Sequence, residues 1–305
     1  MQSAFLFPGQ GSQFEGMLDY LPKDPIVSEL LEESSNILNT TIERLHSKES
    51  LSTTTAVQQC LLIASVSTYR IFEKEGVIPN FLAGHSVGAF GAATAAGVLT
   101  FQDALRLVSL RGELMENSYN DGYGMGVVLG LDEDRLTEIV DSFFEDEHPV
   151  YVSNRNSPTQ ITLSGSKKGL EKVIEYVKTH GATNASLLNV STPSHCPLFK
   201  DVSDRLLSEL NKLDLGRPSI PISSNRNSRL LRNADDVKED LAMSICYPVR
   251  WHDAVNLLYE KGARLFVEMP PGEVLTKLAN HAYQDVRALS VSKIGIDDCL
   301  YVMSH

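Results

Sequence analysis

No stretch of this sequence approaches the roughly 20 consecutive apolar residues that a helix needs to span a bilayer. Lysine and arginine never gather in a cluster longer than a dipeptide, and the formal net charge is −12. A nucleic-acid-binding face would need such a basic cluster. An acidic chain can still bind an anion in a local basic pocket, so single arginines matter. We therefore expect neither a membrane nor a nucleic acid as a partner.

Cysteine is scarce and forms no recognisable pattern. The sequence has four cysteines, none of them in a Cys-x-x-Cys pair: Cys60, Cys196, Cys246 and Cys299. The opening residues carry no basic stretch, and their apolar run is too short for a signal peptide. These features predict free thiols in a reducing cytosol, and hence a cytoplasmic protein.

The composition itself is that of a globular protein. Of the 305 residues, 42% are hydrophobic and 22% are charged, which allows one large domain or a large domain carrying a smaller one. Residues 4–7 and 265–268 are predicted to form buried strands. Residues 55–75 and 101–117 are predicted to form helices, the second of which begins with a capping pattern at Thr100. This alternation predicts a parallel α/β core.

A different order of elements occupies residues 124–190. Strands and helices are predicted there in the order β-α-β-β-α-β, with a turn at Asn156-Ser157-Pro158. That order is the ferredoxin-like arrangement. We therefore predict a small ferredoxin-like subdomain over residues 124–190, inserted into a core formed by residues 1–123 and 191–305. The six predicted segments are 125–129, 132–144, 150–152, 160–163, 167–180 and 185–190.

The segment Gly84-His85-Ser86-Val87-Gly88 has the Gly-x-Ser-x-Gly spacing of a nucleophile elbow, a serine on a sharp turn from a strand into a helix. Residues 81–83 can enter the turn as a strand. Residues 87–97, rich in Ala and Gly, can leave it as a closely packed helix. Such a turn lifts the Ser86 hydroxyl into the open and aims the first helix amides at the group that it attacks. A purely structural turn is the alternative, because a pattern with so few fixed positions recurs by chance.

A serine nucleophile needs a base, and histidine is the usual one. His85 lies on the same turn as Ser86, where a packing role is favoured. His195 lies between two prolines just beyond the predicted insert, and could be aimed at Ser86. The alternative for His195 is an ordinary surface histidine. Cys196 is predicted to be structural, because adjacent side chains in an extended chain point to opposite faces.

Arg111 lies on the apolar face of its predicted helix, three or four residues from Leu107, Val108, Leu114 and Met115. An arginine on an apolar face requires a carboxylate partner. That carboxylate can belong to the protein, in an internal salt bridge, or to a ligand that the guanidinium clamps. The residue pattern leaves both alternatives open.

A series of motifs runs through the chain in the order found in the malonyl-CoA:acyl-carrier-protein transacylase family, which the sequence resembles over its whole length. The resemblance implies an α/β-hydrolase-like parallel-sheet core with a ferredoxin-like insert, the arrangement that the residue pattern also predicts. The motifs are Phe-Pro-Gly-Gln-Gly at 7–11, Gly-His-Ser-x-Gly at 84–88, Arg-Gly-x-Leu-Met at 111–115, Asn-Ser-Pro-x-Gln at 156–160, Pro-Ser-His-Cys at 193–196, Tyr-Pro-Val-Arg-Trp at 247–251 and Pro-Gly-x-Val-Leu at 271–275.

The resemblance implies an acyl transfer in two steps through a serine ester. Ser86 would attack the thioester of malonyl-CoA, and His195 would take its proton. The backbone amides of Gln10 and Val87 would form the oxyanion hole. Arg111 would bind the free carboxylate of the malonyl group.

Further roles follow from the same resemblance. Gln58 and His85 would belong to the substrate-binding residues, and a backbone carbonyl near Ser224-Asn225 would orient His195 in place of a third acid. The malonyl group would then pass to the thiol of a phosphopantetheine-type arm on an acyl carrier protein. The resemblance implies that the enzyme needs no metal and no bound cofactor.

The acceptor is less clearly indicated than the reaction. Residues 86–90 read Ser-Val-Gly-Ala-Phe, where the family more often has Ser-Leu-Gly-Glu. This elbow and residues 57–116 most resemble the malonyltransferase (epsilon) subunit of malonate decarboxylase, which serves a carrier with a phosphoribosyl-dephospho-CoA arm. A stand-alone acyltransferase of a polyketide synthase, with another extender unit, is an alternative. Other subunits of a decarboxylase or a synthase are therefore alternative partners.

A serine hydrolase, such as an acyl-thioester hydrolase, is the alternative reaction. An ordinary α/β-hydrolase has its histidine late in the chain, whereas about a third of this chain follows His195. Arg111 also suits an acyl group with a free carboxylate, which a general esterase does not need. A subunit that only docks partners is disfavoured because Ser86, His195 and Arg111 are all present.

Overall fold

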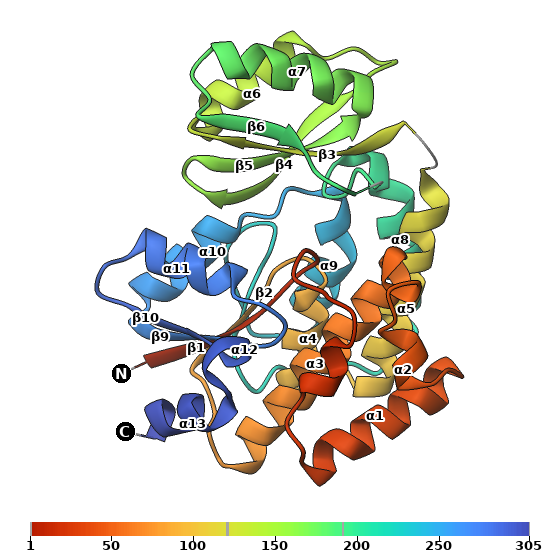
Figure 1. Cartoon of the computed structure of the whole chain (residues 1–305), viewed down its shortest axis with the longest axis vertical. Coiled ribbons are helices and arrows are strands. Elements are labelled where there is room, and N and C mark those ends of the chain that lie inside the picture. Colours follow the sequence, from red (N-terminus) through yellow and green to blue (C-terminus); the bar gives the residue numbers. More distant parts are fainter. Residues whose placement is uncertain (1, 120–121, 191, 305) are drawn as a thin grey trace.

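The computed structural model describes residues 2–119, 122–190 and 192–304, which fold around two separate β-sheets (Figure 1). The larger sheet has six strands in the order β10-β9-β1-β2-β7-β8. All its neighbours are parallel except β8, which runs antiparallel to β7, so the predicted parallel core is confirmed. The strands are β1 Gln2–Phe7, β2 Phe81–Gly84, β7 Ile222–Ser223, β8 Leu230–Leu231, β9 Ala263–Glu268 and β10 Arg287–Ser290.

Helices cover both faces of this sheet. Phe5 and Phe7 of β1 pack against the helices on one face, and Ala4 and Leu6 pack against those on the other, as the alternation of a strand requires. The first face carries α1 Pro25–Leu38, α3 Thr54–Lys74, α4 Gly88–Ala95, α5 Phe101–Ser118, α8 Lys200–Leu210 and α9 Ala234–Met243; the second carries α10 Trp251–Glu260 and α11 Val274–Ala282. The remaining helices are α2 Ile42–Leu45, α12 Val291–Ile294 and α13 Ile296–Ser304, with short 3-10 turns η1 Met17–Tyr20, η2 Ser50–Ser52, η3 Pro197–Phe199 and η4 Ser244–Cys246.

Two helices that position the site, α3 and α5, begin at side-chain caps. Thr53 accepts a hydrogen bond from the Ala56 amide at the start of α3, and Thr100 accepts one from the Asp103 amide at the start of α5. The predicted helices 55–75 and 101–117 are therefore confirmed to within a residue or two. The predicted helix 87–97 is shorter, and its chain turns at Gly97, where φ is +75°.

The smaller sheet is antiparallel, with the strand order β4-β5-β3-β6. Its elements follow the predicted β-α-β-β-α-β order: β3 Tyr123–Leu129, α6 Glu133–Ser142, β4 Val150–Ser157, β5 Gln160–Ser166, α7 Lys167–Thr179 and β6 Asn184–Leu187. The first and third strands lie in the middle, as in a ferredoxin-like fold, and α6 and α7 close a core of their own around Val128, Leu163 and Leu170. We call these elements the small subdomain.

Two details of the small subdomain differ from the prediction. The turn expected at Asn156-Ser157-Pro158 lies two residues later, at Pro158 and Thr159, because β4 continues through Ser157, which pairs with Gln160. The last strand ends at Leu187 rather than Val190, and Val190 lines the cleft described below. The division of the chain at residues 124 and 190 stays a prediction, and Ser191, where the core resumes, lies outside the described residues.

Among the residues that the structure describes, every helix is too short or too polar to span a lipid bilayer.

Candidate active site

Ser86 lies on a strained turn between β2 and α4, at φ +54°. The turn requires its glycines. A Cβ on Gly84 would lie 2.3 Å from the Ala89 nitrogen, and one on Gly88 would lie 2.1 Å from the carbonyl oxygen of Phe7. The Gly-x-Ser-x-Gly pattern thus forms the predicted elbow, packed against the end of β1.

His195 is paired with Ser86. The Nε2 atom of His195 lies 2.8 Å from Ser86 Oγ, although the two residues are 109 positions apart. The histidine has a φ of +65°, and its backbone amide donates to the carbonyl of Ile245 at 2.7 Å. Its Nδ1 atom lies 2.7 Å from the carbonyl oxygen of Ser244, which can only accept. We therefore assign the proton to Nδ1, which leaves Nε2 free to accept from the Ser86 hydroxyl.

The carbonyl that orients His195 is not the predicted one. Ser224 and Asn225 lie at the end of β7, beside β2, and reach the elbow from its other side. The Ser224 hydroxyl and the Asn225 amide donate to the buried carboxylate of Asp240. The Asn225 side chain accepts from the Ser86 amide at 2.9 Å. The prediction was wrong because the η4 turn, and not the end of β7, faces the histidine.

Burial and charge keep His195 neutral. Burial, with the charge of Arg111 as a second cause, lowers the pKa of His195 to about 3. The pKa of His85 is also lowered by burial. His85 does not pair with Ser86: its Nε2 lies 3.0 Å from Asn156 Oδ1, and its ring packs against Trp251 at 5.4 Å. Of these two histidines, His195 therefore has the geometry of a base for Ser86.

Arg111 is a buried cation without a carboxylate. Its side chain is 1% exposed; Nη2 donates to Ser86 Oγ at 3.1 Å and Nη1 to Met115 Sδ at 3.3 Å. No carboxylate pairs with it anywhere in the described part of the chain, where its Nε has no hydrogen-bond partner either. Burial lowers the pKa of Arg111 to about 9, so the guanidinium is still charged at neutral pH. An internal salt bridge, one of the two alternatives for Arg111, is thus wrong, and the guanidinium charge is left without a counterion from the described residues.

Gln58 and Gln10 lie beside this cation. The Gln58 side chain donates to Met115 Sδ at 3.2 Å and to Gln10 Oε1 at 3.3 Å. Its own Oε1 is buried and, among the described residues, has no partner. The backbone amides of Gln10 and Val87 donate to no acceptor in residues 2–119, 122–190 and 192–304. These amides are therefore available to a ligand, as an oxyanion hole requires.

The site opens into a cleft of about 640 Å³ between the core and the small subdomain. Ser86, Gln10 and His85 line it from the core, and Met125, Asn156, Lys167 and Val190 line it from the small subdomain and the segment after it. His195 and Thr192 lie on the connection between the two parts. No group of three His, Cys, Asp or Glu side chains within the described ranges could hold a metal ion.

The roles of Ser244 and Asn156 were missed in the sequence, and the role of Asn225 was assigned wrongly. Ser244 carries no side-chain signal, because its role belongs to a backbone carbonyl. Asn225 was noticed only as part of a predicted orienting segment. Asn156 was assigned to a turn in the sequence. In the structure it lies in β4, one residue before the end of the strand, and it faces the cleft.

The fold and the pairing of Ser86 with His195 define a serine enzyme, and comparison with known proteins gives its class. Residues 4–296 match the acyl transferase domain family. The chain is 36% identical over 294 residues to the malonyl CoA-acyl carrier protein transacylase of Bacillus subtilis, covering 95% of this chain and 93% of that protein. It is 36% identical over 298 residues to the enzyme of the same name from Escherichia coli K12, covering 96% of each.

Solved structures agree. A malonyl-transacylase in complex with a type II polyketide synthase acyl-carrier protein superposes with a TM-score of 0.94 at 34% identity, covering 99% of this chain and 100% of that one. The malonyl CoA-acyl carrier protein transacylase of Coxiella burnetii has a TM-score of 0.95 at 31% identity, covering 100% and 98%. The chain therefore belongs to the acyl transferase family that includes the malonyl CoA-acyl carrier protein transacylases. The resemblance to malonate decarboxylase stays a prediction.

Proposed function

We propose that this chain carries a malonyl group from malonyl-CoA to the thiol of a phosphopantetheine-type arm on an acyl carrier protein, through a malonyl ester on Ser86. The proposal depends most on Arg111, the buried guanidinium 3.1 Å from Ser86 Oγ that has no carboxylate partner among the described residues. A malonyl group can place its free carboxylate on Arg111 while its thioester meets Ser86. An acetyl group would leave the buried charge unpaired.

In the first half of the reaction, Ser86 Oγ attacks the thioester carbonyl and its proton passes to His195 Nε2. The amides of Gln10 and Val87 stabilise the oxyanion of the tetrahedral intermediate, each contributing roughly 3 kcal/mol. The carbon–sulfur bond then breaks, and His195 returns the proton to the departing sulfur of CoA. Malonyl-Ser86 and free CoA remain.

In the second half, the thiol of the carrier arm enters the same cleft. His195 takes its proton as the sulfur attacks the Ser86 ester, and gives it back to Ser86 Oγ as the ester bond breaks. The carbonyl of Ser244 holds the imidazole in one tautomer throughout. Arg111 keeps the malonyl carboxylate in place during both halves, so that the reacting carbonyl returns to the same position.

The identity of the carrier is open within this proposal. The curated relatives carry the general transacylase name, and the solved complex has a carrier of a type II polyketide synthase. The elbow residues favour a malonate decarboxylase carrier. We therefore propose an acyl carrier protein as the partner and keep the decarboxylase and synthase carriers as its alternatives.

We also propose the cytoplasm as the compartment. Support comes from the four cysteines, which are buried and free. Burial raises the pKa of Cys60 and Cys196 to about 12, so these thiols are protonated and unreactive at neutral pH.

The first experiment is the intact mass of the protein after brief mixing with malonyl-CoA, with acetyl-CoA and Ser86→Ala as controls. The proposal expects an adduct of about 86 Da with malonyl-CoA, a weak adduct with acetyl-CoA and none in the variant.

Release of CoA and malonate without an adduct would instead identify a hydrolase. An adduct that every carrier fails to discharge would contradict the transferase while keeping the acyl-enzyme. No adduct and no CoA release would mean that the donor is another acyl group.

A further inference from the structure

The small subdomain is joined to the core by its edge strand β4. One edge of β4 pairs with β5, and the other pairs with a single core residue, Val249. The Val249 amide donates to the Ser153 carbonyl at 2.8 Å, and the Arg155 amide donates to the Val249 carbonyl at 2.8 Å. Val249 thus occupies an edge that would otherwise expose unpaired backbone groups.

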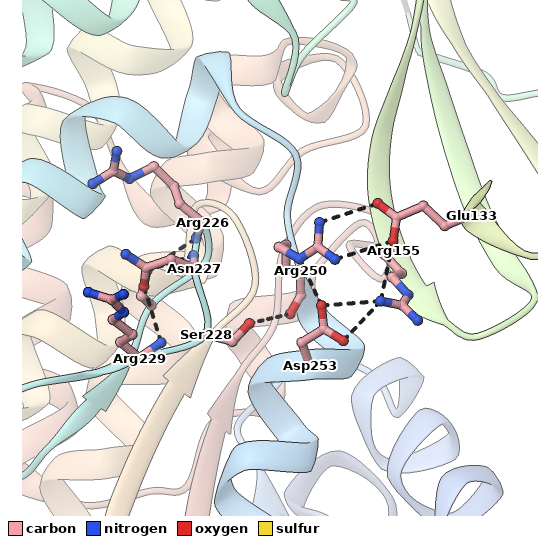
Figure 2. Close-up of polar contacts among 9 residues, drawn as sticks. Glu133, Arg155, Arg226, Asn227, Ser228, Arg229, Arg250 and Asp253 are labelled. Carbon is pink, nitrogen blue, oxygen red and sulfur yellow. Dashed lines mark hydrogen bonds and ion pairs between the residues drawn. The ribbon is translucent and has the colours of Figure 1, made fainter. Parts of the chain in front are cut away.

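Next to this backbone bridge, four charged side chains form a closed ring (Figure 2). Arg250 donates to both oxygens of Glu133 at 3.2 Å, and its Nε donates to Asp253 at 2.8 Å. Arg155 lies 3.1 Å from Asp253 and 3.2 Å from Glu133. Glu133 and Arg155 belong to the small subdomain, whereas Arg250 and Asp253 belong to the core. These side chains are 24–34% exposed, and we call them the ionic quartet.

Hydrogen bonds connect the core residues of this junction to Ser86. The Arg250 amide donates to the Asn225 carbonyl at 2.8 Å, and the Asn225 side chain accepts from the Ser86 amide at 2.9 Å. Trp251, the next residue, packs its buried ring against His85 at 5.4 Å. The motif Tyr-Pro-Val-Arg-Trp therefore contacts the small subdomain through its valine and arginine. It contacts the elbow through its tryptophan, and its arginine backbone is linked to the elbow through Asn225.

The small subdomain in turn supplies one wall of the cleft. Asn156 of β4 lines the cleft and binds His85, and Met125 and Lys167 line it from β3 and α7. The distance of these residues from Ser86 therefore depends on where the small subdomain is held. Partly exposed ion pairs contribute little to the free energy of unfolding. We therefore expect the ionic quartet to act on the position of the small subdomain relative to Ser86.

We propose that Arg250 is a positioning residue: with Glu133, Arg155 and Asp253 it clamps the small subdomain onto the elbow and fixes the width of the cleft above Ser86. The clamp rests on the proposed function only for the identity of the substrate that fills the cleft. Ser86 and His195 keep their own contacts without it, so the clamp acts on binding more than on the nucleophile.

The test is a double-mutant cycle of Glu133→Gln, Arg250→Gln and the two together. Each single variant should raise the KM of the acyl-CoA donor about fivefold, and the double variant should match the singles, because either change opens the same ring. Reaction of Ser86 with phenylmethanesulfonyl fluoride, a small probe that does not span the cleft, should keep its wild-type rate. Glu145→Gln is the matched control, since Glu145 pairs with Lys172 inside the small subdomain at 2.8 Å and should leave KM unchanged.

A second measurement does not depend on any substrate. Hydrogen exchange at the Arg155 and Val249 amides, which form the backbone bridge, should become faster in Glu133→Gln and stay unchanged in Glu145→Gln. If the protein proved not to transfer malonyl groups, the predicted change in hydrogen exchange would still be expected. An unchanged KM together with unchanged exchange would overturn the clamp. A fall in the sulfonyl fluoride rate equal to the loss in kcat/KM would also overturn it, because the quartet would then act on the elbow itself.

Discussion

At the scale of single residues, the site is organised around one unpaired charge. Arg111 has almost no exposed surface, donates to Ser86 Oγ and faces no acidic side chain in the described part of the chain. A buried cation in this state is costly to the folded protein. Under the proposed function, the malonyl carboxylate would offset this cost, so that Arg111 would contribute both affinity and selectivity.

Arg111→Ala should weaken malonyl transfer by roughly 2 kcal/mol or more, because the charge-assisted pair with the acyl carboxylate is lost. Acetyl transfer should survive or rise, since the variant no longer leaves a buried charge unpaired. The measurement is kcat/KM for malonyl-CoA and acetyl-CoA side by side. Equal losses for both donors would mean that Arg111 supports the structure and does not select the acyl group.

The lowered pKa of His195 gives a prediction for pH. With a pKa of about 3, His195 stays neutral, and able to act as a base, far below the pH at which an ordinary histidine is protonated. We expect kcat/KM for Ser86 acylation to stay level from neutral pH down to about pH 5, since this quantity reports the free enzyme.

His195→Ala should slow acylation of Ser86 by a factor of about 10² or more, because the variant has no base to accept the Ser86 proton. This variant checks that the pH profile belongs to His195.

The same shift has a consequence for stability. The unfolded chain binds a proton at His195 near its ordinary pKa, whereas the folded chain does not until about pH 3. Acidification through that window therefore favours unfolding. If kcat/KM for Ser86 acylation instead declined with a midpoint near pH 6.5 while the protein remained folded, the predicted pH dependence of His195 would be contradicted.

At the scale of elements, the elbow brings β1, β2 and α4 so close together that a side chain added at either of its glycines would clash with the backbone. Gly88 lies against the carbonyl of Phe7, and Gly84 lies against the first turn of α4. The Ser86 amide is tied to Asn225, which Asp240 holds from α9. Burial raises the pKa of Asp240, and the hydrogen bonds from Ser224 and Asn225 act in the opposite direction. The nucleophile is thus supported on both sides by neighbouring strands of one sheet.

Gly88→Ala should destabilise the protein by about 3 kcal/mol or more, because its Cβ would lie 2.1 Å from the Phe7 carbonyl oxygen and the backbone would have to move. Gly76→Ala is the matched control. Its Cβ would meet nothing within 4 Å, so only the positive φ of +72° opposes the change, at a cost of about 1 kcal/mol. Urea denaturation midpoints compare the two. Similar midpoints would show that the elbow relaxes around a side chain.

At the scale of the whole molecule, the candidate site lies between two units that have separate cores. Ser86 and Arg111 come from the parallel-sheet core, and Asn156 comes from the small subdomain. A cleft built in this way can admit an extended arm from outside and still surround the acyl group. Its geometry depends on the junction between the units as much as on either unit.

Asn156→Ala should lower kcat/KM for the acyl-CoA donor by about tenfold, because the mutation removes the hydrogen-bond partner of the partly buried His85 Nε2 and loosens one wall of the cleft. Thermal unfolding should shift only slightly, since α6 and α7 keep the core of the small subdomain. Asn227→Ala is the control, because Asn227 is exposed on the hairpin between β7 and β8. An equal loss of activity in the control would remove the case for Asn156.

The elbow, the helix starts and the order of elements in the small subdomain could be predicted from the residues alone. These features are local: glycines at fixed spacing, a capping threonine and a switch of hydrophobic period each act over a few residues. Arg111 was found in the same way, as a charge on an apolar face, although its partner was left open.

The groups that those residues face follow from how the elements pack in three dimensions. Ser244 orients His195 through a backbone carbonyl, which no side-chain pattern can signal. Asn225 meets the Ser86 amide because β7 pairs with β2, a neighbour chosen by the sheet and not by distance along the chain. Glu133 and Arg250 are 117 positions apart and meet where two separately folded units join. Contacts of this kind are made by whole elements as they pack, so their physical cause lies in the assembled sheets and not in any local run of residues.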